Sequence, residues 1–153
     1  MHGFTQDSEI LVPSSSEEWQ RYHEISEKEI FTHIPYITYN LDHHCFKSKA
    51  HHHFIIKLRQ EYTGIIQLEY LDHDEWALRL IAVEARYQNN KIGTRMIAFV
   101  KQFCKMHNAK NIRTHANIRA IEFYKKSGFI EQFWHDISIN EDTKDMVYNI
   151  GGG

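Results

Sequence analysis

Hydrophobic and polar positions change their period several times along the chain, and each change predicts an element of secondary structure. The apolar run from Ile10 to Val12 predicts a short first strand. The serines Ser14–Ser16 precede two glutamates at the spacing of a capping box, and apolar residues then recur with helical period. We therefore expect a helix from about Ser16 to Phe31.

The next patterned region has the period of β-strands. Two apolar runs, Phe54–Leu58 and Gly64–Leu71, are separated by the polar break Arg59–Glu61. The polar triplet Asp72–Asp74 then precedes a third apolar run through Leu78–Val83, and residues of this kind favour tight turns. The pattern predicts three consecutive strands that pair as a meander.

A helical pattern returns after the polar residues that follow the third strand. Apolar residues recur from Ile92 to about Met106, and Asn108 is a suitable C-terminal cap. Lys101 and Lys105 fall on the opposite side of this helix. We expect that side to face solvent.

The last third of the chain predicts shorter elements. Asn111–His115 indicates a short strand, and Asn117 can cap a second short helix that ends at Gly128. Two further strands are expected at residues 129–134 and 146–150.

The resulting order is strand, helix, three strands, helix, strand, helix, two strands. It predicts a mixed α/β (α+β) protein with a crossover helix after the central strand. A length of 153 residues fits one domain. We expect a single domain over residues 1–150 and a flexible tail of three glycines at 151–153.

Composition adds few constraints on partners. The net charge of −2 and the charged fraction of 25% give no reason to expect a nucleic acid or a membrane surface as partner. The start of the chain has no basic segment followed by an apolar one, so we expect a cytoplasmic protein. Cys45 and Cys104 are far apart, which suggests neither a disulfide framework nor a thiolate zinc site, and Cys104 is expected in the core.

Histidine is the unusual component, with 12 residues in all and a cluster at His43, His44 and His51–His53. Imidazole is a common metal ligand, but three adjacent histidines cannot place all their rings on one face of an element. The alternatives are a polar loop with the rings in solvent, or a pocket lined by His43 or His44. The triplet Asp72–Asp74 favours a turn over a metal site, and we expect no bound metal.

The strand, turn and helix between Trp76 and Thr94 are the most suggestive segment. The first N–H groups of a helix have no intrahelical partner, and the helix dipole places partial positive charge there. The polar turn Gln88–Lys91 therefore suits a phosphate or pyrophosphate. A plain structural turn between strand and helix is the alternative.

Two segments carry a family resemblance. Residues 79–94 resemble the acetyl-CoA motif of the GNAT superfamily of N-acetyltransferases, whose pattern is Gln/Arg-x-x-Gly-x-Gly/Ala; Gln88 and Gly93 match, and Lys91 stands where the first glycine belongs. Residues 117–129 resemble the family's second signature, Asn-x-x-Ala-x-x-Phe-Tyr-x-x-x-Gly-Phe. Its fixed positions are all met, by Asn117, Ala120, Phe123, Tyr124, Gly128 and Phe129.

The resemblance, which covers about residues 54–150, implies the GNAT acyltransferase fold. In that fold a mostly antiparallel central sheet, flanked by helices, is splayed at the coenzyme cleft. Acetyl-CoA would be the cosubstrate, with its pantetheine arm against the backbone of Ile81, Ala82 and Val83. Its pyrophosphate would bind the turn residues Gln88, Asn89, Asn90, Lys91, Ile92, Gly93 and Thr94. Asn117 would contact the coenzyme as well as cap a helix.

Lys91 is the departure from the motif. Glycine permits positive φ and close backbone approach. A lysine must then keep an ordinary conformation and direct its side chain away, or bring its ammonium toward phosphate. We hypothesise weakened but retained coenzyme binding.

The implied reaction is transfer of the acetyl group to a primary amine of a small molecule or a protein, by direct attack through a tetrahedral intermediate. By resemblance Tyr124 would be the general acid for the thiolate; the alternative is a core tyrosine packed beside Phe123. A backbone N–H near Ile81–Val83 is the simplest oxyanion donor. Glu69, Glu75 and His115 are the candidate bases on or near strands.

A different function class stays open. A GNAT-fold module that binds CoA without efficient catalysis would serve as a regulator or interaction partner, and Lys91 motivates that alternative. The expected partners are acetyl-CoA and an amine acceptor, and a homodimer is possible.

Overall fold

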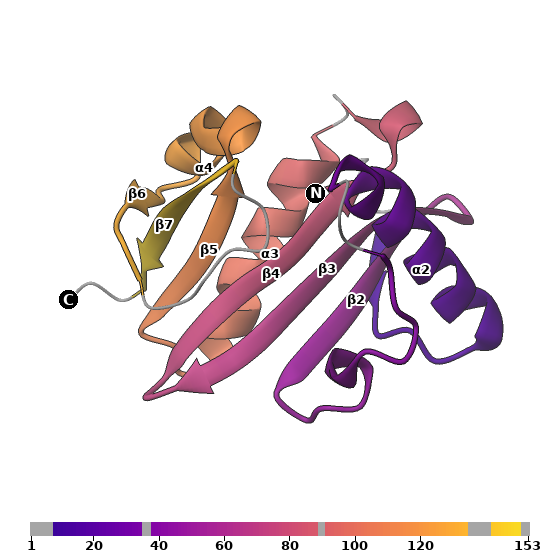
Figure 1. Cartoon of the computed structure of the whole chain (residues 1–153), viewed down its shortest axis with the longest axis horizontal. Helices are drawn as coiled ribbons and strands as arrows, with labels where there is room; N and C mark the ends of the chain where they lie inside the picture. Colours follow the sequence, from indigo (N-terminus) through magenta and orange to yellow (C-terminus); the bar gives the residue numbers. More distant parts are fainter. Residues whose placement is uncertain (1–7, 35–37, 89–90, 135–141, 151–153) are drawn as a thin grey trace. The chain divides into compact units, whose positions relative to one another are not determined.

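The computed structural model describes residues 8–34, 38–88, 91–134 and 142–150. Within them lie three α-helices and a seven-stranded sheet of order β1-β2-β3-β4-β5-β7-β6 (Figure 1). Strands β4 and β5 are parallel, and the pairs β1–β2, β5–β7 and β6–β7 are antiparallel. The predicted mixed α/β class with a mostly antiparallel sheet is confirmed.

The chain forms two compact units. Unit 1 comprises residues 1–67 and 80–93, and unit 2 comprises residues 68–79 and 94–153. Strands β3 (Glu61–Asp72) and β4 (Glu75–Val83) contribute residues to both units. The expectation of a single domain stays a prediction.

Unit 1 contains β1 (Ser8–Leu11), α2 (Ser16–Glu29) and β2 (His51–Leu58). The predicted capping box begins α2: the Glu18 backbone N–H donates to Ser15 Oγ at 3.0 Å, and the Ser15 N–H donates to the Glu18 carboxylate at 3.1 Å.

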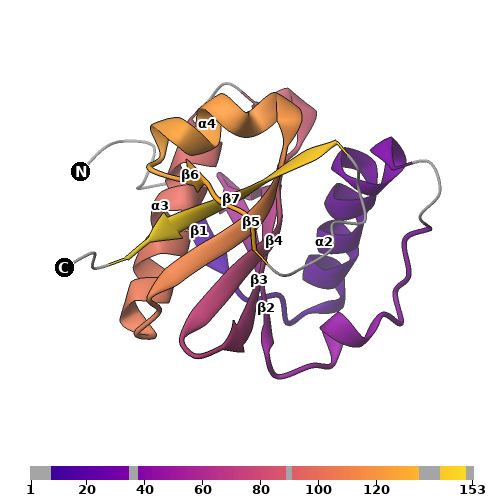
Figure 2. The same cartoon turned by 60° about the vertical axis from the view of Figure 1, so that its left-hand side comes forward.

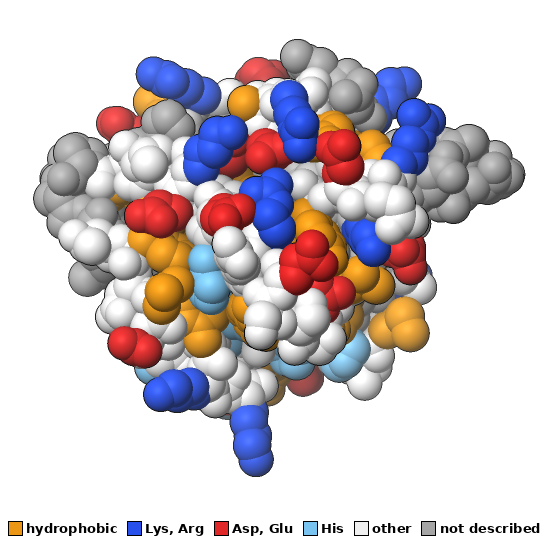
Figure 3. Space-filling view, turned by 90° about the vertical axis from the view of Figure 1, so that its right-hand side faces the viewer, with side chains coloured by type: hydrophobic (Ala, Val, Ile, Leu, Met, Phe, Trp, Pro, Cys, Tyr) orange, Lys and Arg blue, Asp and Glu red, His pale blue; other side chains and the backbone are white. Residues whose placement is uncertain are grey.

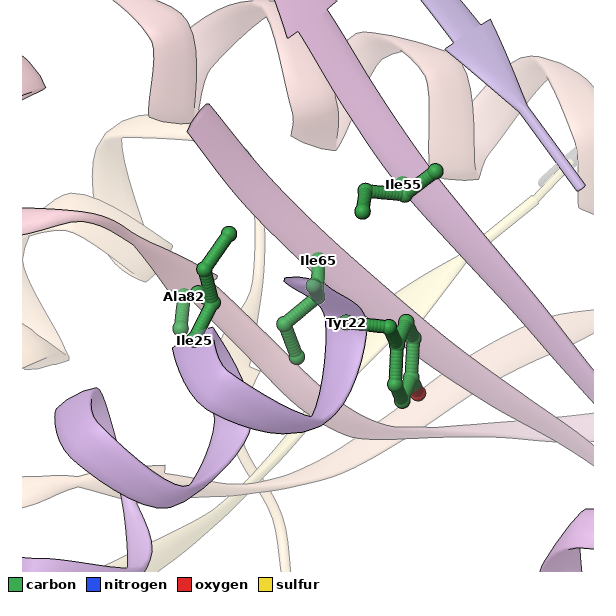
Figure 4. Packing of buried hydrophobic residues seen from close by; sticks show 5 residues of the cluster. All are labelled: Tyr22, Ile25, Ile55, Ile65 and Ala82. Carbon is green, nitrogen blue, oxygen red and sulfur yellow. The ribbon is translucent and has the colours of Figure 1, made fainter. Parts of the chain in front are cut away.

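The core of unit 1 lies between α2 and the strands. Figure 4 shows Tyr22 and Ile25 of α2 close to Ile55, Ile65 and Ala82 of the sheet. These side chains are between 0 and 9% exposed, and their burial holds the helix on the sheet.

Turns join the meander strands at the predicted polar breaks, and each consists of two residues. Arg59 and Gln60 have φ of 50° and 73°, and His73 and Asp74 have φ of 50° and 63°. Two successive residues with positive φ give the turn whose twist matches that of a β-hairpin.

Unit 2 contains most of α3 (Ile92–Met106), then β5 (Asn111–Asn117), α4 (Ile121–Lys126), β6 (Ile130–Glu131) and β7 (Thr143–Asn149). The parallel pairing joins residues 75–78 of β4 to 111–114 of β5. Figure 2 shows β7 running beside β5 in the opposite direction. The crossover helix after the central strand is therefore confirmed.

Two residues with positive φ end the helices of unit 2, as the sequence predicts. Asn108 has φ of 61° after α3, and Gly128 has φ of 94° after α4. A Cβ on Gly128 would lie 3.1 Å from the Tyr148 ring. Cys104 of α3 is fully buried, as expected, and burial raises the pKa of its thiol to about 12.

Three details differ from the sequence prediction. Strand β6 covers only Ile130–Glu131, because the buried Trp134 packs on Ala77 and Val147 instead of extending the strand. Lys101 does not simply face solvent: its ammonium donates to the Ser127 carbonyl and lies 4.4 Å from the Tyr148 ring centroid.

The third difference concerns the histidines. A solvent-exposed loop is correct for His43 and His44, but His51–His53 form the start of β2, and His53 is only 8% exposed. The pleat of the strand directs His53 toward Tyr22 of α2. No helix in the described part of the chain is long and apolar enough to cross a membrane.

Candidate functional site

The turn that the sequence selects follows β4 in unit 1. After Val83 the chain makes a 3₁₀ turn over Ala85–Tyr87, and the Gln88 side-chain amide donates back to the Val83 carbonyl at 3.0 Å. Helix α3 begins at Ile92, as predicted. Asn89 and Asn90 lie outside the described residues.

Lys91, at the position of the first motif glycine, adopts a backbone conformation that favours glycine. Its φ is 63°, in the left-handed region, and its side chain is exposed. Of the two alternatives for Lys91, the ordinary conformation is therefore wrong, and contact of its ammonium with phosphate stays a prediction. The turn keeps its left-handed step although a Cβ makes that step unfavourable by about 1 kcal/mol.

A buried carboxylate anchors the segment that precedes the turn. The Glu84 side chain is 9% exposed and accepts from Arg21 at 3.1 Å and from Arg86 at 2.9 Å. Burial raises the pKa of this carboxyl, but the hydrogen bonds from Arg86 and Arg21 outweigh burial and hold the pKa below its usual range. Glu84 is not among the site residues predicted from the sequence, although it is the first charged residue after the apolar strand.

A surface hollow of about 460 Å³ lies beside Glu84 in unit 1. Its lining residues are Arg21, Glu24, Glu27, Lys28, Thr32 and Glu84. Figure 3 shows basic and acidic side chains next to one another on the face that it views. Arg21 already bonds Glu24 at 2.8 Å as well as Glu84, so the hollow is lined by ion pairs that hold the start of the turn on α2.

The described residues fit an anionic group at the start of α3. Ile92 is buried, Gly93 is half-buried and Thr94 is exposed, and their N–H groups belong to the first turn of a 15-residue helix. The Arg95 Nε atom is buried and has no hydrogen-bond partner among the described residues. A buried cationic donor without an acceptor is a group that an anion satisfies.

Strand β4, which precedes the turn, offers a ligand main-chain groups rather than side chains. Ala82 is packed in the core of unit 1, while Ile81 and Val83 are half-buried. A pantetheine arm could use only main-chain groups at Ala82, which is the interaction that the resemblance implies.

Tyr124 lies on α4 in unit 2 and is 5% exposed. Burial raises the pKa of its phenol to about 12, against a smaller lowering by the hydrogen bond with Thr114. The Thr114 hydroxyl itself donates to the Leu78 carbonyl at 2.9 Å. Tyr124 also packs edge-on against Phe123 and Phe129, so both its core packing and its polar contact are present.

Asn117 is exposed at the end of β5 and caps the turn that leads to α4. Its Oδ1 atom accepts from the Arg119 backbone N–H at 2.9 Å, so the predicted cap is confirmed. Its contact with a coenzyme stays a prediction.

The three candidate bases, all in unit 2, have different partners. Glu69 accepts from Arg79 at 2.8 Å, and Glu75 accepts from Arg113 at 2.7 Å. His115 bonds a carboxylate instead, that of Asp145, with 2.8 Å between Nδ1 and Oδ1.

Stacking on Trp134 brings two of these candidates into one cluster. The His115 ring lies 4.4 Å from the Trp134 ring, and Arg79, the partner of Glu69, lies 5.6 Å from the same ring. Glu75 lies at the other end of the β4–β5 pairing, opposite Asn111. Asp145 and Trp134 are not among the residues predicted from the sequence, since their contacts with β5 leave no local signal.

The histidine cluster does not assemble a metal site within the described residues. No group of three or more histidine, cysteine, aspartate or glutamate residues there could hold an ion. His43 instead accepts the Cys45 backbone N–H at 3.1 Å and caps a short 3₁₀ turn.

Comparison with known proteins supports the resemblance of the two motifs. The model of the Acetyltransferase (GNAT) family matches residues 9–129. A GNAT acetyltransferase from Staphylococcus aureus Mu50 is 21% identical, with a TM-score of 0.73 over 93% of this chain and 98% of that one. Tetrahymena GCN5 is 19% identical, with a TM-score of 0.73 over 94% of this chain and 96% of the other.

The spermidine N-acetyltransferase of Vibrio cholerae, solved with CoA and spermine, is 15% identical. Its TM-score is 0.74 over 94% of this chain and 96% of that one. At these identities the solved structures show the common fold, while the family model covers most of the chain. The chain therefore belongs to the GNAT acetyltransferase family.

Proposed function

We propose that this protein is an acetyl-CoA-dependent N-acetyltransferase that acts on a primary amine of a small molecule or a protein. The observation that carries the proposal is the backbone at Lys91. Its φ of 63° lies in the region that favours glycine, immediately before α3, although the residue is a lysine. A turn with no binding role would gain stability from an ordinary conformation at a lysine.

The coenzyme contacts follow from the motif. The backbone at Ile81–Val83 pairs with the pantetheine arm, and the turn from Gln88 to Thr94 binds the pyrophosphate through N–H groups. Asn117 adds a contact to the coenzyme. The buried Arg95 Nε atom, which has no acceptor among the described residues, supports an anion near the start of α3.

Acetyl-CoA supplies an activated thioester. The neutral amine nitrogen attacks the carbonyl carbon, a C–N bond forms and the C–S bond breaks. The nitrogen gives up one proton to water, which balances the proton that Tyr124 supplies to the thiolate and later regains. A backbone N–H near Ile81–Val83 stabilises the oxyanion. Tyr124 donates its phenolic proton to the departing thiolate, and with a pKa of about 12 the phenol carries that proton throughout the neutral range.

An acceptor panel tests the proposal. Purified protein is incubated with acetyl-CoA and polyamines, aminoglycosides, amino acids or peptide N-termini, and free CoA is measured. Polyamines are included because a structural neighbour was solved with spermine. Acceptor-dependent release of CoA is expected for at least one class, and no turnover on any would contradict the proposal.

The second candidate is a CoA-binding module without efficient catalysis, favoured by the lysine at the motif glycine. Calorimetry separates the two functions. Tight acetyl-CoA binding without turnover on the panel would establish the module, while binding with turnover would establish the enzyme.

Tyr124→Phe tests the general acid. We expect kcat to fall about 10- to 100-fold while the Kd for acetyl-CoA stays within about twofold, since only the proton donor is lost. Phe123→Leu, on the same helix, is the packing control. An unchanged kcat across pH for Tyr124→Phe would leave Tyr124 a core residue.

A further inference from the structure

Two histidine rings attach residues 38–50, the segment that precedes β2, to the helix and the strand beside it in unit 1. His53 of β2 bonds the Cys45 carbonyl, with 2.9 Å between Nε2 and the oxygen. His23 of α2 bonds the Tyr39 hydroxyl, with 2.6 Å between Nδ1 and the oxygen. The attachment of the segment therefore involves the side-chain type that ordinarily titrates closest to neutral pH.

The two hydrogen bonds of His53 require a neutral ring. A carbonyl oxygen only accepts hydrogen bonds, so Nε2 holds the ring proton and donates to Cys45. Nδ1 then has the lone pair, and it accepts from the Tyr22 hydroxyl at 2.7 Å. One neutral imidazole thus joins β2, α2 and the segment.

The closed arrangement has no place for a second ring proton. His53 is 8% exposed, and Tyr22 is fully buried. A proton on Nδ1 would turn the Tyr22 hydroxyl hydrogen away from its acceptor, and that hydroxyl has no other hydrogen-bond partner among the described residues. Burial accordingly lowers the pKa of His53 to about 4, although the hydrogen bond with the Cys45 carbonyl acts in the opposite direction.

The groups around His53 leave a charge on its ring without compensation. The rings of Trp19, Tyr22 and Phe46 lie 5.5, 5.3 and 5.1 Å from it, between centroids. The titratable groups that face the ring or its Tyr22 partner are Tyr22 and His23 of α2, Tyr39 and Cys45 of the segment, and His51 and His52 of β2. Within the part of the chain that the structure describes, this set includes no carboxylate.

The second attachment responds to acid in the same direction. The His23 ring packs against Phe46 and Tyr39, with centroids 4.9 and 5.5 Å apart, and burial lowers the pKa of His23. Burial raises the pKa of Tyr39 to about 12, and the charge of Glu27 acts on this phenol as well. The phenol therefore keeps its proton at neutral and acidic pH, and His23 is the group of this pair that acid changes.

We propose that residues 38–50 form a strap that acid releases: a proton taken up by His53 opens the strap from α2 and β2 while the strands of unit 1 stay paired. This conformational switch goes beyond the proposed transfer reaction. The pairing of β2 with β1 uses residues 55–58 of β2, which lie outside the strap. Opening uncovers the ring surfaces of Trp19, Tyr22 and Phe46.

The difference in pKa gives the direction and the range of the switch. In the open strap the His53 ring has the ordinary pKa near 6.5, whereas in the closed strap its pKa is about 4. The open form binds the proton first, so the closed form is fully favoured above pH 6.5 and loses its advantage as the pH falls toward 4. Between pH 7 and pH 5 this linkage raises the ratio of open to closed strap about 20-fold.

Backbone ¹⁵N relaxation dispersion on the full chain tests the switch, because it measures the population of a minor conformation that exchanges with the closed one. Spectra are recorded at pH 7, 6 and 5. We expect exchange in residues 38–50, with an open population that rises about 20-fold from pH 7 to pH 5. The amides of α3 in unit 2 report on wider opening and should show no exchange at the same rate.

Three variants locate the group that titrates. His53→Gln takes up no proton, so its open population should change less than about threefold over the same pH range, the remainder being due to His23. Tyr39→Phe removes the second attachment and should raise the open population about fivefold at every pH. His44→Gln is the matched control, since His44 is an exposed histidine of the same strap and its loss should leave the pH dependence unchanged.

Several results would overturn the proposal. Wild type without exchange confined to residues 38–50 at pH 5 has no such switch, and a pH dependence that persists in His53→Gln belongs to another group. If His53→Gln does not fold, long-range ¹H–¹⁵N spectra of the wild-type histidine rings take its place. The protonation of His53 must then follow the open population, and a ring that takes up its proton while the strap stays closed contradicts the proposal.

Discussion

His53 and His115 are both held at Nδ1 by a neighbouring side chain, but the two regions use the ring in opposite ways. In unit 1, His53 Nδ1 accepts from the Tyr22 hydroxyl at 2.7 Å, and Nε2 donates to the Cys45 carbonyl at 2.9 Å. In unit 2, His115 Nδ1 donates to Asp145 at 2.8 Å. One ring is fixed by two neutral groups and the other by a carboxylate.

The difference shows that the partner, rather than the residue type, decides what a histidine can do. His53 lies among the rings of Trp19, Tyr22 and Phe46, and burial lowers its pKa to about 4. Among the described residues, the hydrogen-bond and ring partners of His53 include no carboxylate that could balance a proton, so the ring is a neutral structural bridge. A carboxylate such as Asp145 can balance a positive ring, which a proton carrier requires.

The largest expected effect is the difference in the free energy of unfolding between alanine variants of the two histidines. His53→Ala leaves the Tyr22 hydroxyl and the Cys45 carbonyl without their partner and opens a cavity, so the free energy of unfolding should fall by about 4 kcal/mol. His115→Ala should cost about 1 kcal/mol. Urea denaturation at pH 7 measures both. A larger loss for His115→Ala would invert the comparison.

The next effect is a pH dependence of stability. The pKa of His53 is about 4 in the folded protein and near 6.5 in the unfolded chain, so the unfolded chain binds the proton first. Stability is therefore intact above pH 6.5 and falls as the pH drops toward 4, by about 3 kcal/mol. Burial lowers the pKa of His23 as well, which acts in the same direction.

Urea denaturation at pH 7, 6, 5 and 4 measures this loss. The His53→Ala variant lacks the group and should show a shallower dependence over the same range. An equal slope in wild type and His53→Ala would place the titrating group elsewhere.

A smaller effect on stability is expected when the hydrogen-bond partner of each histidine is replaced instead of the histidine itself. Tyr22→Phe removes one buried hydroxyl and leaves His53 Nδ1 without its donor, which should cost about 1 to 2 kcal/mol. Asp145→Asn should cost less than about 1 kcal/mol, because its partner is partly accessible to water. Thermal unfolding of both variants checks the order, and a greater cost for Asp145→Asn would contradict it.

The smallest expected effect on stability comes from a change in backbone conformation, at Lys91. Lys91→Gly relieves the left-handed strain but loosens the unfolded chain, so stability should rise by no more than about 1 kcal/mol. Calorimetric titration with acetyl-CoA measures the effect of the same substitution on coenzyme affinity. Much tighter binding supports a steric role for Lys91, and much weaker binding supports contact of its ammonium with phosphate.

Local signals explain what the sequence could predict. The Ser15–Glu18 capping box, the span of α3 from Ile92 to Met106 and the Asn117 cap each depend on residues within a few positions of one another. The two GNAT motifs are equally local. The family and the element order could therefore be predicted without coordinates.

The missed features depend on partners that are distant in the sequence. The burial of His53 depends on Tyr22, 31 positions away, and the hydrogen bond of His115 depends on Asp145, 30 positions away. Lys101 was expected to face solvent. Its partner, the carbonyl of Ser127, lies at the end of α4, 26 positions away, and leaves no local signal in the sequence. The left-handed backbone at Lys91 could not be predicted either, because residue type argued against it.

The placement of the two thiols has a practical consequence. Cys45 belongs to unit 1 and Cys104 to unit 2, and both are buried. With a pKa of about 12, only about one Cys104 in 10⁵ is ionised at pH 7, so an alkylating reagent reacts mainly when the fold opens. Mass spectrometry of the two labelled peptides would therefore measure the alkylation rate of each cysteine separately. Equal rates would show that the units open together, and unequal rates would show that they open one at a time.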